Sequence, residues 1–186
     1  MEEELTFSTR EKFRAWLRAH GEAGGGVWLV FGKPGGRKTL KASEALEEAL
    51  CFGWIDGHLK SFEGCGALQR FTPRSRGSSW SELNKERVRR LERLGRMTDA
   101  GRDCLPAMGP RSFRIHEDIE RELKKARLWT RFKSFPPLYQ RVRADNIQQV
   151  RSQPDEYRKR LNRLIEATRQ GKLYGEWDDF RRLSMQ

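Results

Sequence analysis

The stretch WIDGHLKSFEGCGALQRFTP, residues 54–73, predicts a β-hairpin and decides the class of the fold. Two runs of strand-forming residues, 54–62 and 68–72, are separated by a glycine-containing turn. Pro73 is expected to end the second strand, because proline has no N–H group to donate to a β-ladder. The apolar run VWLVF, residues 27–31, predicts a further and buried strand.

Helical periodicity accounts for most of the remaining chain. Ser8 and Glu11 have the spacing of a capping box at the start of a helix over residues 8–20, and a second helix is expected over residues 43–52. Beyond the hairpin only helices are expected, over residues 79–95, 98–105, 112–128, 136–150 and 154–169. The predicted fold is therefore α+β, with a small antiparallel sheet packed with helices and a helical C-terminal half.

The chain length of 186 residues suits one domain with a single core. We expect one domain over residues 1–186, with an α+β part over about residues 5–105 and a helical part over about residues 112–172. Apolar residues at strand or helix spacing are expected to be buried together in its core. These residues are Phe13, Leu17, Leu29, Leu50, Ile55, Val88 and Leu91.

Positive charge is unevenly distributed along the sequence. The chain has 38 Lys and Arg against 26 Asp and Glu, a formal net charge of +12. Residues 1–66 carry 9 basic and 10 acidic groups, residues 67–133 carry 18 and 9, and residues 134–186 carry 11 and 7. The basic part of the chain is compatible with a solvated surface, with an anionic small molecule or acidic protein as partner, or with nucleic acid.

Cysteine and histidine give no sign of a metal or cofactor site. Cys51, Cys65 and Cys104 form no CxxC pair, and the three histidines lie far apart in the sequence, so we expect neither a disulfide framework nor a metal. The N-terminal MEEELTFS is acidic and lacks the apolar segment of a signal peptide, and the longest apolar run is too short to span a bilayer. We therefore expect a cytoplasmic protein without a membrane span or cofactor.

Polar residues alternate along the first strand of the hairpin. Regular alternation would put four side chains on one face of it, namely Trp54, Asp56, His58 and Lys60. One hypothesis is a pocket floored by Trp54, in which Asp56 orients a donor and Arg70 or Arg74 binds an anion. The planar guanidinium group suits a carboxylate or phosphate. The alternative is a solvent-exposed face that carries a structural ion pair between Asp56 and an arginine.

The segment after the hairpin leads into a helix start. Ser79 is expected to cap this helix, and the unpaired N–H groups at a helix N-terminus form an anion site. Trp80 and the hydroxyl groups of Ser79 and Ser81 would lie around it, so these three residues complete the predicted ligand-binding set. The alternative is capping by Ser79 without any ligand.

The helix predicted over residues 79–95 and the residue just after it carry many cations. These are Lys85, Arg87, Arg89, Arg90, Arg93 and Arg96. At 100° per residue they spread around the exposed arc, and glutamates interrupt them, so they form no single face for reading a DNA groove. Sequence-independent binding to a nucleic-acid backbone stays open.

Several motifs resemble those of the YdeI/OmdA (bacteriocin-protection) family. They are Phe13-x-x-Trp16-Leu17, Gly26-Val27-Trp28-Leu29, ALCFGWIDG at residues 49–57 and QRFTPRSRGSSWSELNKERVRRLERLGRMTDAG at residues 69–101. Residues 159–168 also resemble the helical segment that the family places near its end. The resemblance implies a link to protection against bacteriocins and cationic peptides and to an outer-membrane porin. It implies no catalytic residues.

We therefore expect a non-enzymatic accessory protein of bacteriocin or envelope-stress resistance that binds an anionic ligand or an acidic partner through a basic face. A net charge of +12 repels cationic peptides, so protection is expected to be indirect. One alternative is a nucleic-acid-binding regulator. Another is an enzyme acting on an anionic metabolite, for which Asp56 and His58 are the candidate bases.

Overall fold

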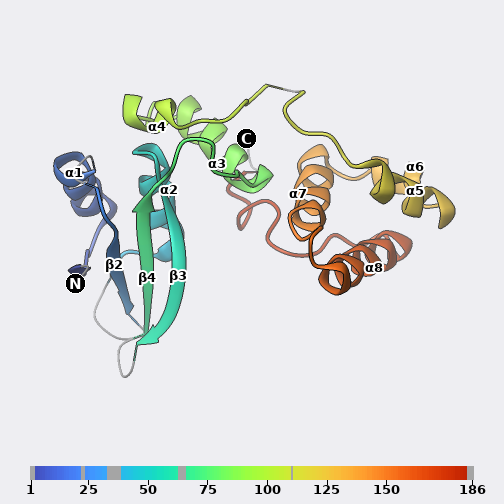
Figure 1. Ribbon diagram of the computed structural model, residues 1–186, viewed down its shortest axis with the longest axis horizontal. Helices are drawn as coiled ribbons and strands as arrows, with labels where there is room; N and C mark the ends of the chain where they lie inside the picture. The colour runs from blue at the N-terminus through green and yellow to red at the C-terminus, as the bar shows by residue number, and fades with distance from the viewer. Residues whose placement is uncertain (1–2, 22–23, 33–38, 63–65, 110, 184–186) are drawn as a thin grey trace. The chain divides into compact units, whose positions relative to one another are not determined.

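The computed structural model describes residues 3–21, 24–32, 39–62, 66–109 and 111–183. In these residues the chain forms, in order, β1 (Glu3–Leu5), α1 (Arg10–His20), β2 (Val27–Gly32), α2 (Ala42–Cys51), β3 (Trp54–Phe62), β4 (Gly66–Pro73), α3 (Glu82–Arg93), α4 (Asp99–Asp103), α5 (Glu117–Lys125), α6 (Trp129–Lys133), α7 (Pro137–Gln148) and α8 (Pro154–Gln170) (Figure 1). The residues between the two hairpin strands, Cys65 among them, lie outside the described ranges. The predicted α+β fold with a helical C-terminal half is confirmed.

The chain forms two compact units. The first unit comprises residues 1–79 and 88–106, and the second comprises residues 80–87 and 107–186. Helix α3 contributes its first six residues to the second unit and its remainder to the first. The single domain expected from the sequence stays a prediction.

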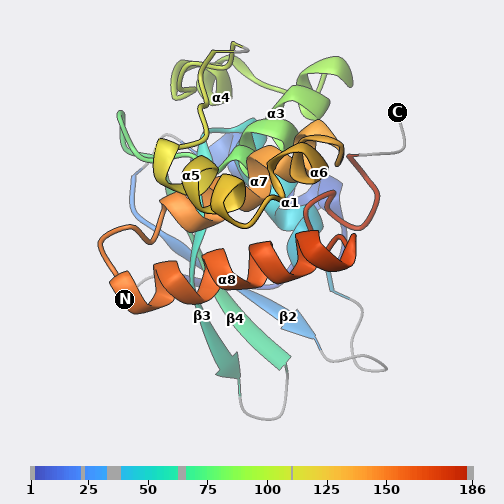
Figure 2. The same ribbon diagram turned by 90° about the vertical axis from the view of Figure 1, so that its right-hand side faces the viewer.

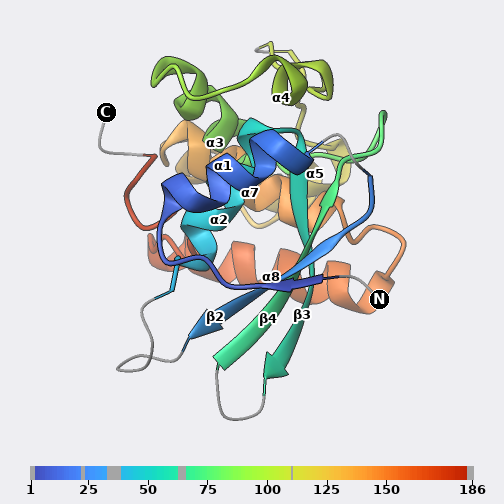
Figure 3. The ribbon, with the colours of Figure 1, turned by 90° about the vertical axis from the view of Figure 1, so that its left-hand side faces the viewer.

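The four strands of the first unit form one mixed sheet in the order β1-β2-β4-β3. As the predicted hairpin requires, β4 pairs antiparallel with β3. It also pairs antiparallel with β2, a neighbour that the sequence did not specify. The sequence did not predict β1, whose three residues pair parallel to the start of β2, with Glu3 opposite Val27. Figure 3 shows β2, β4 and β3 side by side, with α1 and α2 above them.

The core of the first unit lies between the sheet and the helices α1 and α2. Phe13 and Leu17 of α1 pack with Leu29 of β2 and with Trp54 and Phe71 of the hairpin. Six of the seven residues predicted to be buried together are buried, but only Phe13, Leu17 and Leu29 belong to this cluster, and Ile55 is half-buried. Since successive strand residues face opposite sides of a sheet, the inward side chain of Trp54 places Ile55 on the other face.

Helices alone build the core of the second unit. Ile119 and Leu123 of α5 pack with apolar residues of α6, α7 and α8, including Phe132, Tyr139 and Leu164. Helix α8 ends at Gly171, a glycine with a φ of 69° that suits a helix C-terminus. No helix in the described part of the chain is long and apolar enough to cross a membrane.

The starts of α1 and α5 differ from the prediction. Thr9, and not Ser8, is the N-cap of α1, where its side chain accepts a hydrogen bond from the Lys12 N–H. Helix α5 begins five residues later than predicted, at Glu117, because residues 112–116 form no helix. The three acidic residues in its first turn, Glu117, Asp118 and Glu120, suit a helix N-terminus because they complement the helix dipole.

Candidate functional site

The residues predicted to bind a ligand are divided between the two units. The first unit contains Trp54, Asp56, His58, Arg70, Arg74 and Ser79, and the second contains Trp80 and Ser81. The structure therefore places six of the eight in one unit. Ligand binding by these residues stays a prediction.

Trp54 is a core residue of the first unit. Its side chain is 2% exposed, and its Nε1 donates a hydrogen bond of 3.1 Å to the Gly21 carbonyl oxygen. The ring of Trp16 meets it edge-on, with 5.8 Å between the ring centroids. Burial of the large indole stabilises the packing of α1 on the sheet.

The alternation predicted for β3 is broken by a β-bulge. Pairing with β4 shifts register between Asp56 and Leu59, so that Asp56 faces Phe71 while Lys60 faces Leu68. Phe71 and Leu68 are three residues apart in a strand, which places them on opposite faces of the sheet. Asp56 and Lys60 therefore also point to opposite faces.

Side-chain contacts agree with this register. The Asp56 carboxylate accepts a hydrogen bond of 3.0 Å from Gln69 Nε2, and the Lys60 ammonium lies 4.4 Å from the centroid of the Trp28 ring. Gly57 lies inside the bulge, where glycine is tolerated because it has no side chain to pack. The prediction that four polar or aromatic side chains of this strand share one face is wrong for that reason. The four residues are Trp54, Asp56, His58 and Lys60.

Arg74 binds the segment that follows its own strand. Its Nη1 donates hydrogen bonds to the Ser78 hydroxyl at 3.2 Å and to the Ser79 carbonyl oxygen at 3.1 Å. Burial lowers the pKa of the Arg74 guanidinium, and the nearby Cys104 and Asp56 oppose that shift. Arg74 therefore orders the chain between β4 and α3.

The start of α3 is capped by protein oxygens from the second unit. The Ser81 hydroxyl accepts a hydrogen bond of 3.2 Å from the Asn84 N–H, and the Asp145 carboxylate accepts one of 2.9 Å from the Glu82 N–H. The prediction that Ser79 caps this helix is wrong, because the helix begins three residues after Ser79. A carboxylate of the protein thus lies where the sequence predicted a bound anion.

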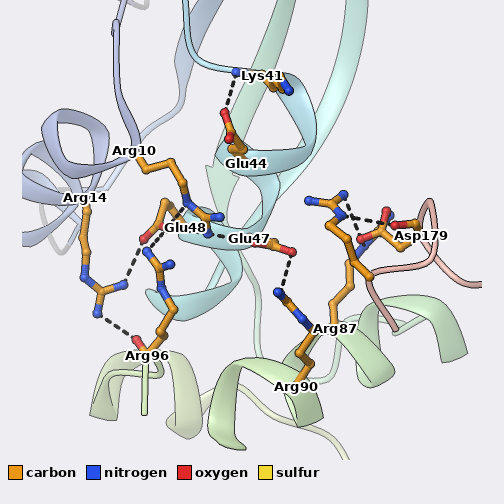
Figure 4. Close-up of polar contacts among 11 residues, drawn as sticks. Arg10, Arg14, Lys41, Glu44, Glu47, Glu48, Arg87, Arg90, Arg96 and Asp179 are labelled. Carbon is orange, nitrogen blue, oxygen red and sulfur yellow. Dashed lines mark hydrogen bonds and ion pairs between the residues drawn. The ribbon is translucent and has the colours of Figure 1, made fainter. Parts of the chain in front are cut away.

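A buried pair of carboxylates in α2 forms ion pairs with arginines of the first unit (Figure 4). Glu47 and Glu48 are 1% and 0% exposed. Glu47 is bound at 2.8–3.1 Å by two arginines, and Glu48 is bound by three. The four arginines are Arg10, Arg14, Arg90 and Arg96. We call these four arginines and the two glutamates the Glu47–Glu48 cluster. The sequence signal was a Glu-Glu pair inside the otherwise apolar helix ALEEALC.

Several basic residues of α3, and Arg96 after it, form ion pairs with carboxylates of the protein. Arg90 and Arg96 belong to the Glu47–Glu48 cluster, and Lys85 pairs with Glu82 at 2.9 Å. In the second unit Arg87 binds the buried Asp179 carboxylate through two nitrogens, at 2.8 and 3.2 Å. Four of the six basic residues noted in this segment therefore neutralise the protein's own carboxylates.

A cleft of about 590 Å³ opens between α5 and α8 of the second unit. Figure 2 shows α5 above α8 in the view. The cleft is lined by Asp118, Arg121, Glu122, Arg151, Pro154, Tyr157, Arg158, Leu161, Asn162 and Ile165. A second hollow of about 430 Å³ shares Asp118, Arg121 and Arg151 with it and extends to Arg114 and His116.

One end of the cleft is organised by Arg151. Its guanidinium bonds to His116 Nδ1 at 2.8 Å and to the Asp118 carboxylate at 3.2 Å. Burial alone would raise the pKa of Asp118, but the adjacent Tyr157 hydroxyl, the Ile119 N–H and the charge of Arg151 hold it below its ordinary value. Burial and the neighbouring Asp118 raise the pKa of Tyr157 to about 12. Asp118 therefore stays ionised and Tyr157 stays neutral at neutral pH.

Other arginines of the cleft face solvent. Arg114, Arg121 and Arg158 are all exposed. Within the described residues no carboxylate pairs with Arg114 or Arg158, and the nearest to Arg121 is Glu122 at 4.0 Å. An exposed guanidinium group that keeps its donors can bind a carboxylate or phosphate bidentately. We take this cleft as the candidate functional site.

The sequence analysis missed this cleft. It predicted a helix over residues 154–169 but no cleft beside it. The available signal was the pair of cations Arg151 and Arg158 on either side of a helix start. That is the same combination of arginines and helix N-terminus that led to the prediction after β4.

Two family models match the chain. Residues 112–171 match the family described as "Bacteriocin-protection, YdeI or OmpD-Associated" (OmdA), and this segment contains the whole cleft. Residues 5–104 match a "Domain of unknown function (DUF8412)". No curated protein and no solved structure matches the chain.

The resemblance to the YdeI/OmdA family is thereby confirmed, although its location differs from the prediction. The motifs that suggested it lie mainly within residues 49–101, where the DUF8412 model matches, and the OmdA model matches the segment after them. The first match alone covers more than half of the 186 residues. The chain therefore belongs to the DUF8412 family, whose model covers residues 5–104, and its residues 112–171 match the YdeI/OmdA family model.

Proposed function

We propose that this protein is a non-enzymatic accessory protein of bacteriocin or envelope-stress resistance, and that it binds an anionic ligand or acidic partner at the cleft between α5 and α8. Membership of the YdeI/OmdA family suggests the association with bacteriocin protection. The observation that carries the binding proposal is the set of exposed arginines of the cleft, Arg114, Arg121 and Arg158. The matched segment carries 15 basic and 8 acidic residues, which favours anions at long range.

The titratable groups of the cleft favour binding over catalysis. A general base or acid works best when its pKa lies near the working pH. The pKa of Asp118 lies below its ordinary value because of its partners, and that of Tyr157 is raised to about 12. Neither group is suited to exchange a proton with a substrate at neutral pH.

Protection would then be indirect. A net charge of +12 repels cationic peptides, so the protein is a poor trap for them. We also propose a cytoplasmic location, where the free Cys51 and Cys104 would stay reduced. Burial raises the pKa of Cys51 to about 11, which keeps this thiol unreactive.

A screen by thermal unfolding tests the binding proposal. Sulfate, pyrophosphate, citrate, benzoate, a short acidic peptide and an oligonucleotide would each be added to the full chain, because a ligand of the native state raises Tm. We expect at least one anion to raise Tm in the wild-type protein and to lose this effect in the double variant R121Q/R158Q.

The matched control is R111Q/K172Q, which removes the same charge at two exposed residues that do not line the cleft. It should keep the response of the wild type. Equal losses in both double variants would show that the response depends on net charge alone, and the assignment to the cleft would then be wrong.

A further inference from the structure

The cleft between α5 and α8 changes character along its length. Its lining residues on α8 run from Pro154 to Ile165, which corresponds to about 17 Å at 1.5 Å per residue. Arg158 and the preceding Arg151 lie near the beginning of α8, whereas Leu161 and Ile165 follow one and two turns later. The cleft is therefore cationic at one end and apolar at the other.

Two helix starts reinforce the cationic end. Asp118 in the first turn of α5 and Pro154 at the first position of α8 both line the cleft, so both helices begin there. Helix N-termini carry a partial positive charge. Acidic residues of α5 offset part of it, but Asp118 is already paired with Arg151. An anion at this end would meet Arg121 and Arg158.

The apolar end is part of the core of the second unit. Leu161 and Ile165 pack in the same cluster as Leu164, and the Tyr157 ring contacts that cluster too. Leu161 is 7% exposed and Ile165 is half-buried, so their outer atoms form the wall of the cleft. An apolar group placed against this wall would lose contact with water, which favours its binding.

The charge balance of the lining limits the ligand. The cleft and the adjoining hollow are lined by four arginines and three carboxylates, so their formal sum is one positive charge. The carboxylates are Glu117, Asp118 and Glu122. A polyanion would be repelled by these groups along its length. A volume of about 590 Å³ also lies in the range of small-molecule sites.

We infer that the cleft takes a small amphiphilic anion, in which one carboxylate or phosphate group is joined to a short aliphatic or aromatic body. The anionic group binds between Arg121 and Arg158, and the body lies along Tyr157, Leu161 and Ile165. This inference rests on the proposed anion binding at the same cleft and adds the chemical class of the ligand.

A series of alkyl phosphates tests the inference. Ethyl, butyl and hexyl phosphate carry the same head group, and calorimetric titration of the full chain would give their dissociation constants. We expect the affinity to rise about twofold to fourfold for each added methylene, since each buried methylene contributes about that factor. R121Q/R158Q should weaken all three phosphates alike.

Variants at the apolar end separate the two parts of the ligand. I165T should reduce the dependence on chain length and leave ethyl phosphate unchanged, whereas the control L173T, at an exposed leucine outside the cleft, should change neither. Thermal unfolding of each variant without ligand shows whether it is folded. A dependence on chain length that I165T leaves intact would overturn the inference.

The remaining outcomes distinguish the inference from the proposed function. If ethyl and hexyl phosphate bind equally, the inference fails and anion binding stands; if no anion of the screen or the series binds, both fail. Tighter binding of polyphosphate than of hexyl phosphate at equal ionic strength would overturn the inference that the ligand is a small amphiphilic anion. So would binding to phosphatidylglycerol vesicles that hexyl phosphate does not compete, which would indicate a membrane surface as the partner.

Discussion

The Glu47–Glu48 cluster of the first unit and the cleft of the second unit both gather arginines, but they use them differently. In the cluster, four arginines surround two buried carboxylates, and each of the four forms an ion pair with at least one of them. In the cleft, Arg114 and Arg158 have no carboxylate partner within the described residues. The comparison teaches that the number of arginines in a segment says little about ligands, because the buried carboxylates decide which arginines stay available.

The largest expected effect comes from removing a carboxylate of the cluster. Glu48→Ala leaves Arg10, Arg14 and Arg96 without their shared partner, and breaking a buried ion pair costs about 3–5 kcal/mol. Urea unfolding would measure the loss of stability. The control Glu166→Ala removes an exposed carboxylate that pairs with Arg169 and should have no measurable effect. Similar stability of both variants would show that the cluster is not structural.

A smaller effect is expected at Asp179, the buried carboxylate of the second unit. Burial alone would raise the pKa of Asp179, but the hydrogen bonds and charge of Arg87 and the charge of Arg182 hold it below its ordinary value. Its contribution to stability is therefore present above the unfolded pKa of about 3.9 and is lost as the pH falls through the folded pKa. Asp179→Asn should cost about 2 kcal/mol at pH 7.

Unfolding free energies measured between pH 2 and pH 7 would check this prediction. The wild type should lose stability below about pH 4, and the loss should be smaller in Asp179→Asn. An unchanged acid profile in the variant would show that Arg87 and Arg182 do not hold Asp179 in the native state.

Asp145 should show the opposite pH dependence. Burial raises the pKa of Asp145, although the Glu82 N–H and Gln149 hydrogen bonds oppose the shift. A carboxyl group whose folded pKa is raised loses stability as the pH rises from its unfolded pKa through its folded pKa. Asp145→Ala removes an acceptor at the start of α3 and should cost about 1 kcal/mol at neutral pH. The cost should be larger at acid pH, where the protonated carboxyl contributes most to stability.

Urea unfolding at each pH between 2 and 7 would compare Asp145→Ala with Asp145→Asn. The amide can still accept the Glu82 hydrogen bond without a charge, so it should restore most of the lost stability. Equal losses in the two variants would contradict a capping role.

The sequence predicted elements well where one local rule decided them. The hairpin strands, α2 and α8 follow from alternation or helical spacing. The bulge at Gly57 depends on pairing between strands, and β1 has three residues, two of them Glu, without strand character of their own. The partners of the α3 cations depend on carboxylates up to 92 residues away, as for Arg87 and Asp179. Such contacts have no local signature. For the cleft, the sequence shows two arginines beside a helix start, but not that α5 and α8 together line a cleft there.

The smallest change in stability is expected in the cleft itself. Residues kept for binding commonly contribute little to stability or reduce it. Arg121 and Arg158 face solvent, with both carboxylates and cations near them, so R121Q/R158Q should change the unfolding free energy by less than about 0.5 kcal/mol. Any change should be larger at low ionic strength, because salt screens exposed charges.

Urea unfolding at low and at moderate salt would measure this difference, with R111Q/K172Q as the variant of equal charge. A loss above about 1 kcal/mol in R121Q/R158Q would show that the cleft arginines support the fold, as those of the Glu47–Glu48 cluster do. The contrast between the two regions would then disappear. An arginine that serves a ligand and not the fold should give two results when it is replaced: the unfolding free energy stays almost unchanged, and anion binding is lost.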